Sequence, residues 1–313
     1  MKIIRTVFMG TPEFAVEPLR KLVESGFKPE LCITQPDRPS GRKKRLTSPA
    51  LKVAAESYRI EIWQPENINE EPTIALLRDI KPDLIITAAY GGYIGRIIRK
   101  IPLLAAINIH PSLLPRYRGA TPINSALWNG DRKTGVSIFR LTARMDAGPI
   151  LSQSEYNITE DDNYTKLLDK LSQQGAEDLI RLLQKWEISN IKGTLQDERK
   201  AIFCRKLQKD DLRINWEGSA GEIYNQVRAL AEKPGAVTEF RGSLIKIIKC
   251  RIITAQKGFA SGIIIDKLKK EGIIVSTGDG TLLVEKVQPA GKSIMNAYEF
   301  DLGARIRTGE RFI

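Results

Sequence analysis

The stretch at residues 107–119 reads Ile107-Asn108-Ile109-His110-Pro111-Ser112-Leu113-Leu114-Pro115-Arg116-Tyr117-Arg118-Gly119. It continues an apolar run that begins at Leu103 and indicates a buried strand. Pro111 has no backbone N–H to donate to a strand ladder, so we expect the strand to end at His110. Asn108 and His110 are two residues apart, which places both side chains on one face at the strand's carboxyl end. In open α/β sheets, active sites lie at that end of the strands.

His110 is the only histidine among the 313 residues. Any acid–base chemistry by an imidazole near neutral pH must therefore use this residue. The alternative is a buried histidine with satisfied hydrogen bonds and no chemical role. The amide of Asn108 on the same face, and the loop rich in Pro, Arg and Gly that follows, favour a catalytic role.

Three further segments accompany this stretch: Met9–Ala15, Arg144–Ile150 with Asp146 at its centre, and Gln288–Lys292. Together the four segments resemble the folate-dependent formyltransferases, and the resemblance covers nearly the whole chain. It implies formyl transfer from 10-formyltetrahydrofolate to the amino group of methionyl-initiator tRNA, a step of translation initiation. The chain departs from the family pattern at Gly92, Gly95 and Arg96, where the family usually has Gln and Leu-Pro.

Alternating strand and helix patterns through about residue 158 predict a parallel α/β sheet, Rossmann-like in form. Beyond residue 210, short apolar runs separated by Gly-containing turns predict a small β-barrel, for which we choose the OB type. We therefore expect a catalytic formyltransferase domain at 1–189, a linker at 190–209, and an OB-like tRNA-binding domain at 210–313.

Formyl transfer to an amine passes through a tetrahedral intermediate with negative charge on the former carbonyl oxygen. His110 suits the proton transfer, and the neutral NH₂ of Asn108 suits the oxyanion. Asp146 can hydrogen-bond the imidazole, because the strand at 135–141 that leads to it is expected beside the catalytic strand. A second mechanism is also open, in which Asp146 takes part in the proton transfer through a water molecule.

The resemblance implies that Ser112, Leu113, Leu114 and Pro115 line the folate site; without it they would be an ordinary turn. Arg116 and Arg118 could contact the glutamate tail of folate or a tRNA phosphate, or could be surface arginines. The chain's three cysteines, Cys32, Cys204 and Cys250, are far apart, and with one histidine they form no zinc-like spacing, so we expect no metal.

The net charge of +12 favours a polyanionic partner. Residues 190–313 hold 22 Lys and Arg against 15 Asp and Glu, a net +7 on the shorter part of the chain. A long loop is expected at 35–49, and it contains Arg42, Lys43, Lys44 and Arg45. Such charge runs are usually solvated loops. In the family this loop enters the tRNA acceptor stem, so we expect these four residues to bind tRNA phosphates.

No apolar run approaches the roughly 18 residues of a membrane span, and the start of the chain does not resemble a signal peptide. Three widely spaced cysteines suggest no disulfide framework and therefore a reducing compartment, so we expect a cytoplasmic protein. We also expect a monomer, since no heptad repeat or exposed apolar stripe is apparent. Alternative functions are a related formyltransferase acting on a small amine, such as an amino-sugar nucleotide or glycinamide ribonucleotide, a formyl-folate hydrolase, and a non-catalytic RNA-binding protein.

Overall fold

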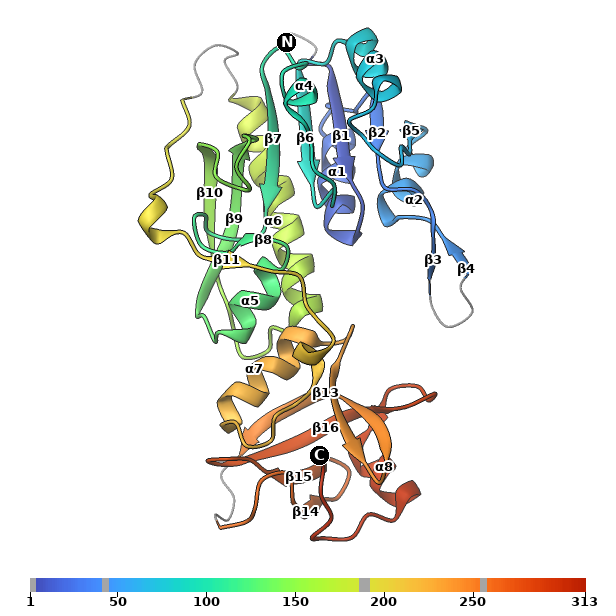
Figure 1. Ribbon diagram of the computed structural model, residues 1–313, viewed down its shortest axis with the longest axis vertical. Helices are drawn as coiled ribbons and strands as arrows, with labels where there is room; N and C mark the ends of the chain where they lie inside the picture. The colour runs from blue at the N-terminus through green and yellow to red at the C-terminus, as the bar shows by residue number, and fades with distance from the viewer. Residues whose placement is uncertain (1–3, 41–44, 186–191, 254–257) are drawn as a thin grey trace. The chain divides into compact units, whose positions relative to one another are not determined.

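The computed structural model describes residues 4–40, 45–185, 192–253 and 258–313 (Figure 1). The chain divides into two compact units whose segments alternate along the sequence. The first unit takes residues 1–119, 133–157 and 168–204, and the second takes 120–132, 158–167 and 205–313. The domain boundaries expected from the sequence stay a prediction.

The first unit is built on a seven-stranded sheet with the order β10-β9-β7-β6-β1-β2-β5. Its strands are β1 (Thr6–Gly10), β2 (Leu31–Ile33), β5 (Glu61–Trp63), β6 (Leu84–Ala88), β7 (Ala105–His110), β9 (Lys133–Arg140) and β10 (Ile150–Asn157). The pairs from β5 through β7 are parallel, which confirms the α/β prediction. β9 runs antiparallel to both of its neighbours, β7 and β10.

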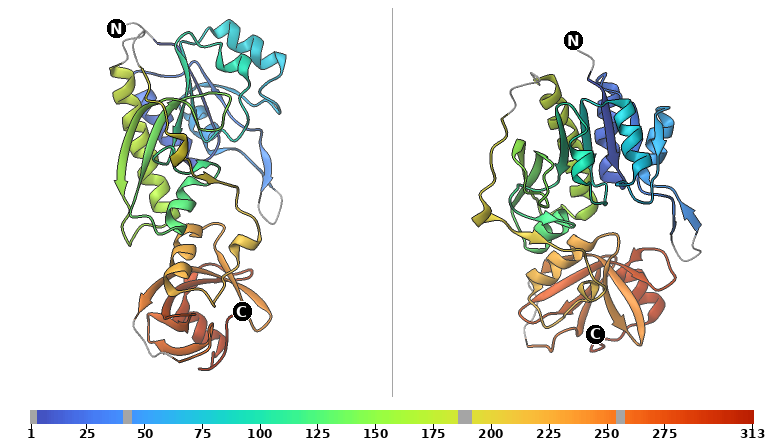
Figure 2. Two further views of the ribbon diagram at one scale, coloured as in Figure 1. Left: turned by 60° about the vertical axis from the view of Figure 1, so that its left-hand side comes forward. Right: turned by 45° about the horizontal axis from the view of Figure 1, so that its top comes forward.

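Helices cover both faces of this sheet (Figure 2). They are α1 (Val16–Glu24), α2 (Ala50–Ser57), α3 (Glu71–Ile80), α4 (Arg96–Arg99) and α6 (Tyr164–Gln184), with the short turns η1 (Glu13–Ala15) and η2 (Glu198–Lys200). On one face, side chains of α3 and α4 join those of β1, β2 and β6 in a buried cluster. On the other, α6 comes so close at Gly175 that a Cβ there would lie 2.8 Å from Ile109. Both faces of the central strands are therefore buried, as expected for a parallel sheet.

Two segments that we expected to be irregular contain paired strands. The predicted loop at 35–49 includes β3 (Arg38–Ser40) and β4 (Arg45–Thr47), which pair antiparallel. The predicted linker at 190–209 includes β11 (Phe203–Cys204), which pairs with β8 (Arg118–Gly119). Two- and three-residue strands show no hydrophobic periodicity, so the sequence pattern could not reveal them.

The second unit is an antiparallel sheet with the order β12-β13-β16-β15-β14, in which β17 also pairs with β16. Its elements are α5 (Pro122–Trp128), η3 (Asp210–Leu212), α7 (Ala220–Leu230), β12 (Ala236–Phe240), β13 (Ser243–Ile253), β14 (Ile264–Leu268), β15 (Gly272–Ser276), β16 (Thr281–Pro289), β17 (Met295–Asn296) and α8 (Ala297–Ala304). The sequence expectation of a small β domain after residue 210 is confirmed.

The C-terminal segment joins the two edges of this second sheet. Ile313 exchanges two backbone hydrogen bonds with Glu239 of β12, and Phe312 donates to the carbonyl of Gly262, just before β14. Phe312 is fully buried and stacks on Trp216, with ring centroids 5.7 Å apart. Linking the edges in this way gives the sheet the barrel-like closure that the short-strand pattern predicted.

Candidate active site

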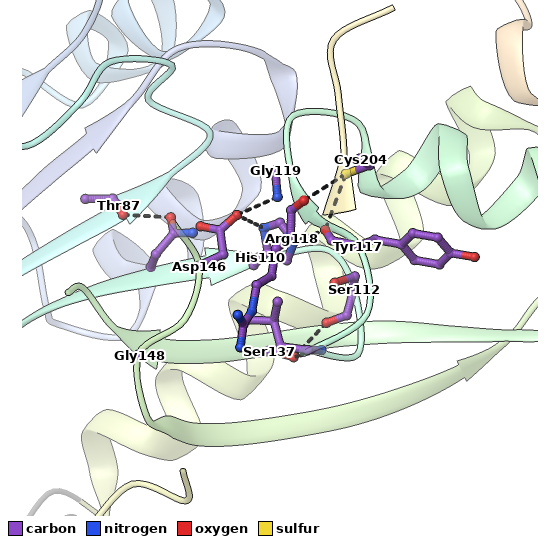
Figure 3. Close-up of polar contacts among 12 residues, drawn as sticks. Thr87, His110, Ser112, Tyr117, Arg118, Gly119, Ser137, Asp146, Gly148 and Cys204 are labelled. Carbon is purple, nitrogen blue, oxygen red and sulfur yellow. Dashed lines mark hydrogen bonds and ion pairs between the residues drawn. The ribbon is translucent and has the colours of Figure 1, made fainter. Parts of the chain in front are cut away.

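The carboxyl end of β7 carries the two polar side chains that the sequence singled out, Asn108 and His110, of which His110 is labelled in Figure 3. β7 ends at His110, one residue before Pro111, as expected. The N–H of Ser112 returns to the carbonyl of His110 at 2.9 Å, so the chain turns sharply there. Although it lies at a strand end, His110 is only 4% exposed.

Asn108 is oriented by a neighbour that sequence reasoning missed. Thr87 of β6 lies opposite Asn108 in the parallel register. Its Oγ1 has two acceptors in reach, Oδ1 of Asn108 at 2.7 Å and the carbonyl of Ile107 at 3.0 Å, and the shorter contact is the one to Asn108. With that oxygen engaged, the NH₂ group points the other way, and in the described part of the chain it has no hydrogen-bond partner. Asn108 therefore offers a free amide donor, as an oxyanion site requires.

The hydrogen bonding of His110 identifies its tautomer. Its Nε2 lies 2.9 Å from the carbonyl oxygen of Tyr117. A carbonyl can only accept, so Nε2 carries the proton when the ring is neutral, and the lone pair is on Nδ1. The edge-on ring of Phe139, with centroids 6.4 Å apart, fills the space beside the imidazole. The side chain is thus held so that Nδ1 is the basic nitrogen.

Asp146 faces that basic nitrogen. Its Oδ2 lies 3.8 Å from Nδ1 of His110 and accepts a hydrogen bond of 2.8 Å from the backbone N–H of Gly119. A separation of 3.8 Å is too long for a direct hydrogen bond, but it allows strong attraction once the imidazole is protonated. Asp146 has a φ of +47°, a left-handed conformation that costs an L-residue about 1–2 kcal/mol. The loop therefore holds this carboxylate against local strain.

The loop around Asp146, and not the strand end, brings the three groups together. β9 lies beside β7, as predicted, but its antiparallel direction carries Arg140 toward Ile107 and away from His110. The chain then folds back, with the N–H of Arg140 bonding to the carbonyl of Pro149. The return loop places Asp146 at the carboxyl end of β7.

The four residues predicted to line the folate site divide into two pairs. Ser112 and Leu114 are buried, and the backbone N–H of Leu114 donates to Oγ of Ser137 at 3.0 Å. Leu113 and Pro115 instead line a cavity of about 420 Å³, together with Arg116, Arg199, Lys200, Ala201 and Ile202. Of the four residues, only Leu113 and Pro115 can therefore contact a molecule bound in this cavity.

Arg118 is not a surface arginine, so one of the alternatives left open for it is wrong. Its side chain is 1% exposed, and it forms paired 3.0 Å bonds from Nη1 and Nη2 to the carboxylate of Glu198. Its Nε and Nη2 also donate to Oε1 of Gln196 at 3.0 and 2.8 Å. The hydrogen bond from Arg118 lowers the pKa of Glu198 from its ordinary value. These contacts leave Arg118 engaged within the protein.

Of the four basic residues expected to bind tRNA, only Arg45 is described; Arg42, Lys43 and Lys44 lie outside the described residues. Arg45 is exposed in β4. At the base of this β3–β4 hairpin, Asp37 accepts hydrogen bonds from Gln64 at 2.8 Å and from Lys52 at 2.9 Å. These contacts, with Gln64 foremost, lower the pKa of Asp37 and tie the hairpin to the sheet unit.

Among the described residues, no group of three or more His, Cys, Asp or Glu side chains is placed to hold a metal ion. Cys32, Cys204 and Cys250 are buried, and none of them forms a disulfide. Burial raises the pKa of the Cys32 thiol to about 12. None of the described helices is long and apolar enough to span a membrane.

Comparisons with known proteins find similar sequences over nearly the whole chain. Residues 1–183 match the formyl transferase family, and residues 206–305 match the formyl transferase C-terminal domain. The methionyl-tRNA formyltransferase of Bacillus velezensis is 40% identical over 307 residues, which cover 98% of this chain and 96% of that protein. The methionyl-tRNA formyltransferase of Thermotoga maritima is 37% identical over 309 residues, covering 99% and 98%.

Solved structures share the fold at lower identity. WlaRD, a sugar 3N-formyl transferase solved with dTDP and 5-N-formyl-THF, has a TM-score of 0.64 at 20% identity, covering 94% of this chain and all of that one. HypX from Aquifex aeolicus in complex with tetrahydrofolic acid has a TM-score of 0.65 at 17% identity, covering 96% and 47%.

An amide, an imidazole and a carboxylate beside one strand end of an α/β sheet are groups that an enzyme can use for proton transfer and oxyanion stabilisation. The chain belongs to the formyl transferase family, which confirms the resemblance seen in the sequence, and it is a formyltransferase.

Proposed function

We propose that this formyltransferase moves the formyl group of 10-formyltetrahydrofolate to the amino group of methionyl-initiator tRNA. The observation that carries the proposal is the convergence of Asn108, His110 and Asp146 in a chain that matches methionyl-tRNA formyltransferases over nearly its whole length.

In the proposed reaction, the methionyl amine attacks the formyl carbon, and the C–N bond to N10 of folate then breaks. The free amide protons of Asn108 stabilise the oxyanion of the tetrahedral intermediate. Nδ1 of His110 takes the proton that the attacking nitrogen loses and then gives it to N10, which leaves as the neutral N–H amine of tetrahydrofolate. Asp146, 3.8 Å away, stabilises the imidazolium formed in between.

The binding roles are part of the same proposal. Leu113 and Pro115 contact folate from the cavity that they line, while Ser112 and Leu114 support that loop from within. Arg42, Lys43, Lys44 and Arg45 bind phosphates of the tRNA. We assign catalysis to residues 1–189 and tRNA binding to 210–313, joined by 190–209, in a monomeric cytoplasmic enzyme.

The test mixes purified protein with 10-formyltetrahydrofolate and methionyl-charged initiator tRNA, and measures formyl-methionyl-tRNA. Parallel reactions contain elongator methionyl-tRNA, an amino-sugar nucleotide, or no acceptor. We expect formylation of initiator tRNA only. Formylation of the sugar, or release of tetrahydrofolate without an acceptor, would overturn the tRNA assignment.

The same assay tests the site. Asn108→Ala and His110→Ala should each lower kcat at least about 100-fold, the effect typical of losing an oxyanion donor or an acid–base group. Lys133→Ala, which removes an exposed cation on β9 bonded to Glu155, is the control and should keep wild-type kcat. Near-wild-type activity of either site variant would refute its assigned role.

A further inference from the structure

Residues 194–204, which we call the strap, run across the loop that carries Asp146 and the segment that follows His110. Thr194 exchanges two 2.8 Å backbone hydrogen bonds with Ile150. At the other end, the N–H of Arg118 donates to the carbonyl of Ile202 at 2.8 Å, and β11 pairs with β8. The strap is therefore anchored on both sides of Gln196, which lies between its ends.

The side chain of Gln196 bonds to both catalytic loops at once. Its Nε2 donates to the carbonyl oxygens of Asp146 at 2.8 Å and Gly148 at 2.7 Å. Its Oε1 accepts two hydrogen bonds from Arg118, which lies in the loop after His110. All four polar contacts of one amide are thus used to join the Asp146 loop to the His110 loop.

The contact with Asp146 falls on the residue whose backbone is strained. Asp146 has a left-handed φ of +47°, and Gln196 holds its carbonyl while Gly119 holds its carboxylate. Arg118 is itself fixed by Glu198, which also pairs with Arg144 two residues before Asp146. The amide therefore sits at the centre of a closed hydrogen-bond network around this loop.

We infer that Gln196 is a positioning residue for catalysis, which holds the carboxylate of Asp146 at its distance from His110. The inference rests on the proposed function of the site. Misplacement of a catalytic group by about 1 Å can cost about 100-fold in rate. Gln196 touches no reacting atom, so its effect must pass through Asp146.

Two variants separate the donor from the acceptor role of Gln196. Gln196→Ala should lower kcat about 10- to 100-fold and leave KM for both substrates within about twofold. Gln196→Glu keeps an acceptor for Arg118 but has no donor for the two carbonyls, so it should be no more active than Gln196→Ala. The control is Leu195→Ala: Leu195 is the neighbouring residue of the strap and is 81% exposed, so kcat should be unchanged.

A double-mutant cycle distinguishes positioning from a general structural role. In an Asp146→Asn background, where the carboxylate is already lost, Gln196→Ala should cost at most about twofold more. The full Gln196 effect in that background, or wild-type kcat in folded Gln196→Ala, would overturn the inference. A wild-type protein without formylation activity would instead refute the proposed function.

Discussion

At the scale of single residues, Thr87 is the support of the proposed oxyanion donor. Thr87→Val removes the hydroxyl that holds Oδ1 of Asn108 and frees the amide to rotate. We expect kcat to fall about tenfold, less than the about 100- to 1000-fold typical of deleting an oxyanion donor.

The matched control for Thr87→Val is Thr134→Val. The Oγ1 of Thr134 is buried and has no hydrogen-bond partner among the described residues, so this change should leave kcat as it is and the protein at least as stable. Steady-state formylation and urea unfolding measure both variants. Equal kcat for Thr87→Val and wild type would show that Asn108 needs no support.

Glu310 gives a prediction about acid stability. Hydrogen bonds from Arg241 and from the backbone of Arg307 lower its pKa to about 2, from an ordinary value of 4.5. A carboxyl with a lowered pKa in the folded state stabilises the protein above its unfolded pKa, and that stability is lost as the pH falls toward 2. In Glu310→Gln, the free energy of unfolding should therefore fall less steeply than in wild type as the pH is lowered from about 5 to 2.

Urea unfolding followed by tryptophan fluorescence measures this effect, because Trp216 is buried in the same unit. Glu299→Gln serves as the control, since Glu299 is exposed and has no ion pair in the described part of the chain. A decline of the same steepness in Glu310→Gln and wild type would contradict the prediction.

At the scale of elements, the pairing of β8 with β11 depends on Gly119. Its φ is +120°, and a Cβ there would lie 2.2 Å from the backbone oxygen of Cys204. Gly119→Ala must push β11 away and shift the N–H that bonds to Asp146, so we expect kcat to fall at least about tenfold along with stability.

Gly26→Ala is the control for that change. Gly26 also has a positive φ, +83°, but its added Cβ would meet nothing within 4 Å. It should lose only about 1–2 kcal/mol of stability from backbone strain, with kcat unchanged. Formylation rates and thermal melting compare the two; wild-type kcat in Gly119→Ala would show that β8–β11 pairing does not support the site.

At the scale of the whole molecule, the net charge of +12 predicts salt-dependent binding of tRNA. The logarithm of the association constant should fall linearly with the logarithm of salt concentration. Arg45→Gln should make that slope shallower by about one unit if Arg45 contacts a phosphate. Lys28→Gln, the same charge change at another exposed position, should leave the slope unchanged; equal slopes for Arg45→Gln and wild type would exclude the contact.

The sequence by itself determined the local features of this protein. Pro111 ends β7 at His110, and a spacing of two puts Asn108 and His110 on one face. The alternation of strands and helices predicted the α/β unit, and short strands between glycines predicted the β unit. These features depend on backbone geometry and on residue spacing within short segments, so they can be predicted from the local sequence alone.

Only the tertiary structure decided how the site is completed. Thr87 lies 21 residues from Asn108, and Gln196 lies 50 residues from Asp146, so no local pattern links them. The antiparallel direction of β9, the tautomer of His110 and the burial of Arg118 likewise depend on which groups the folded chain brings together. Contacts between distant residues arise from the path of the whole chain, because a hydrogen bond is set by position in space and not by separation in sequence.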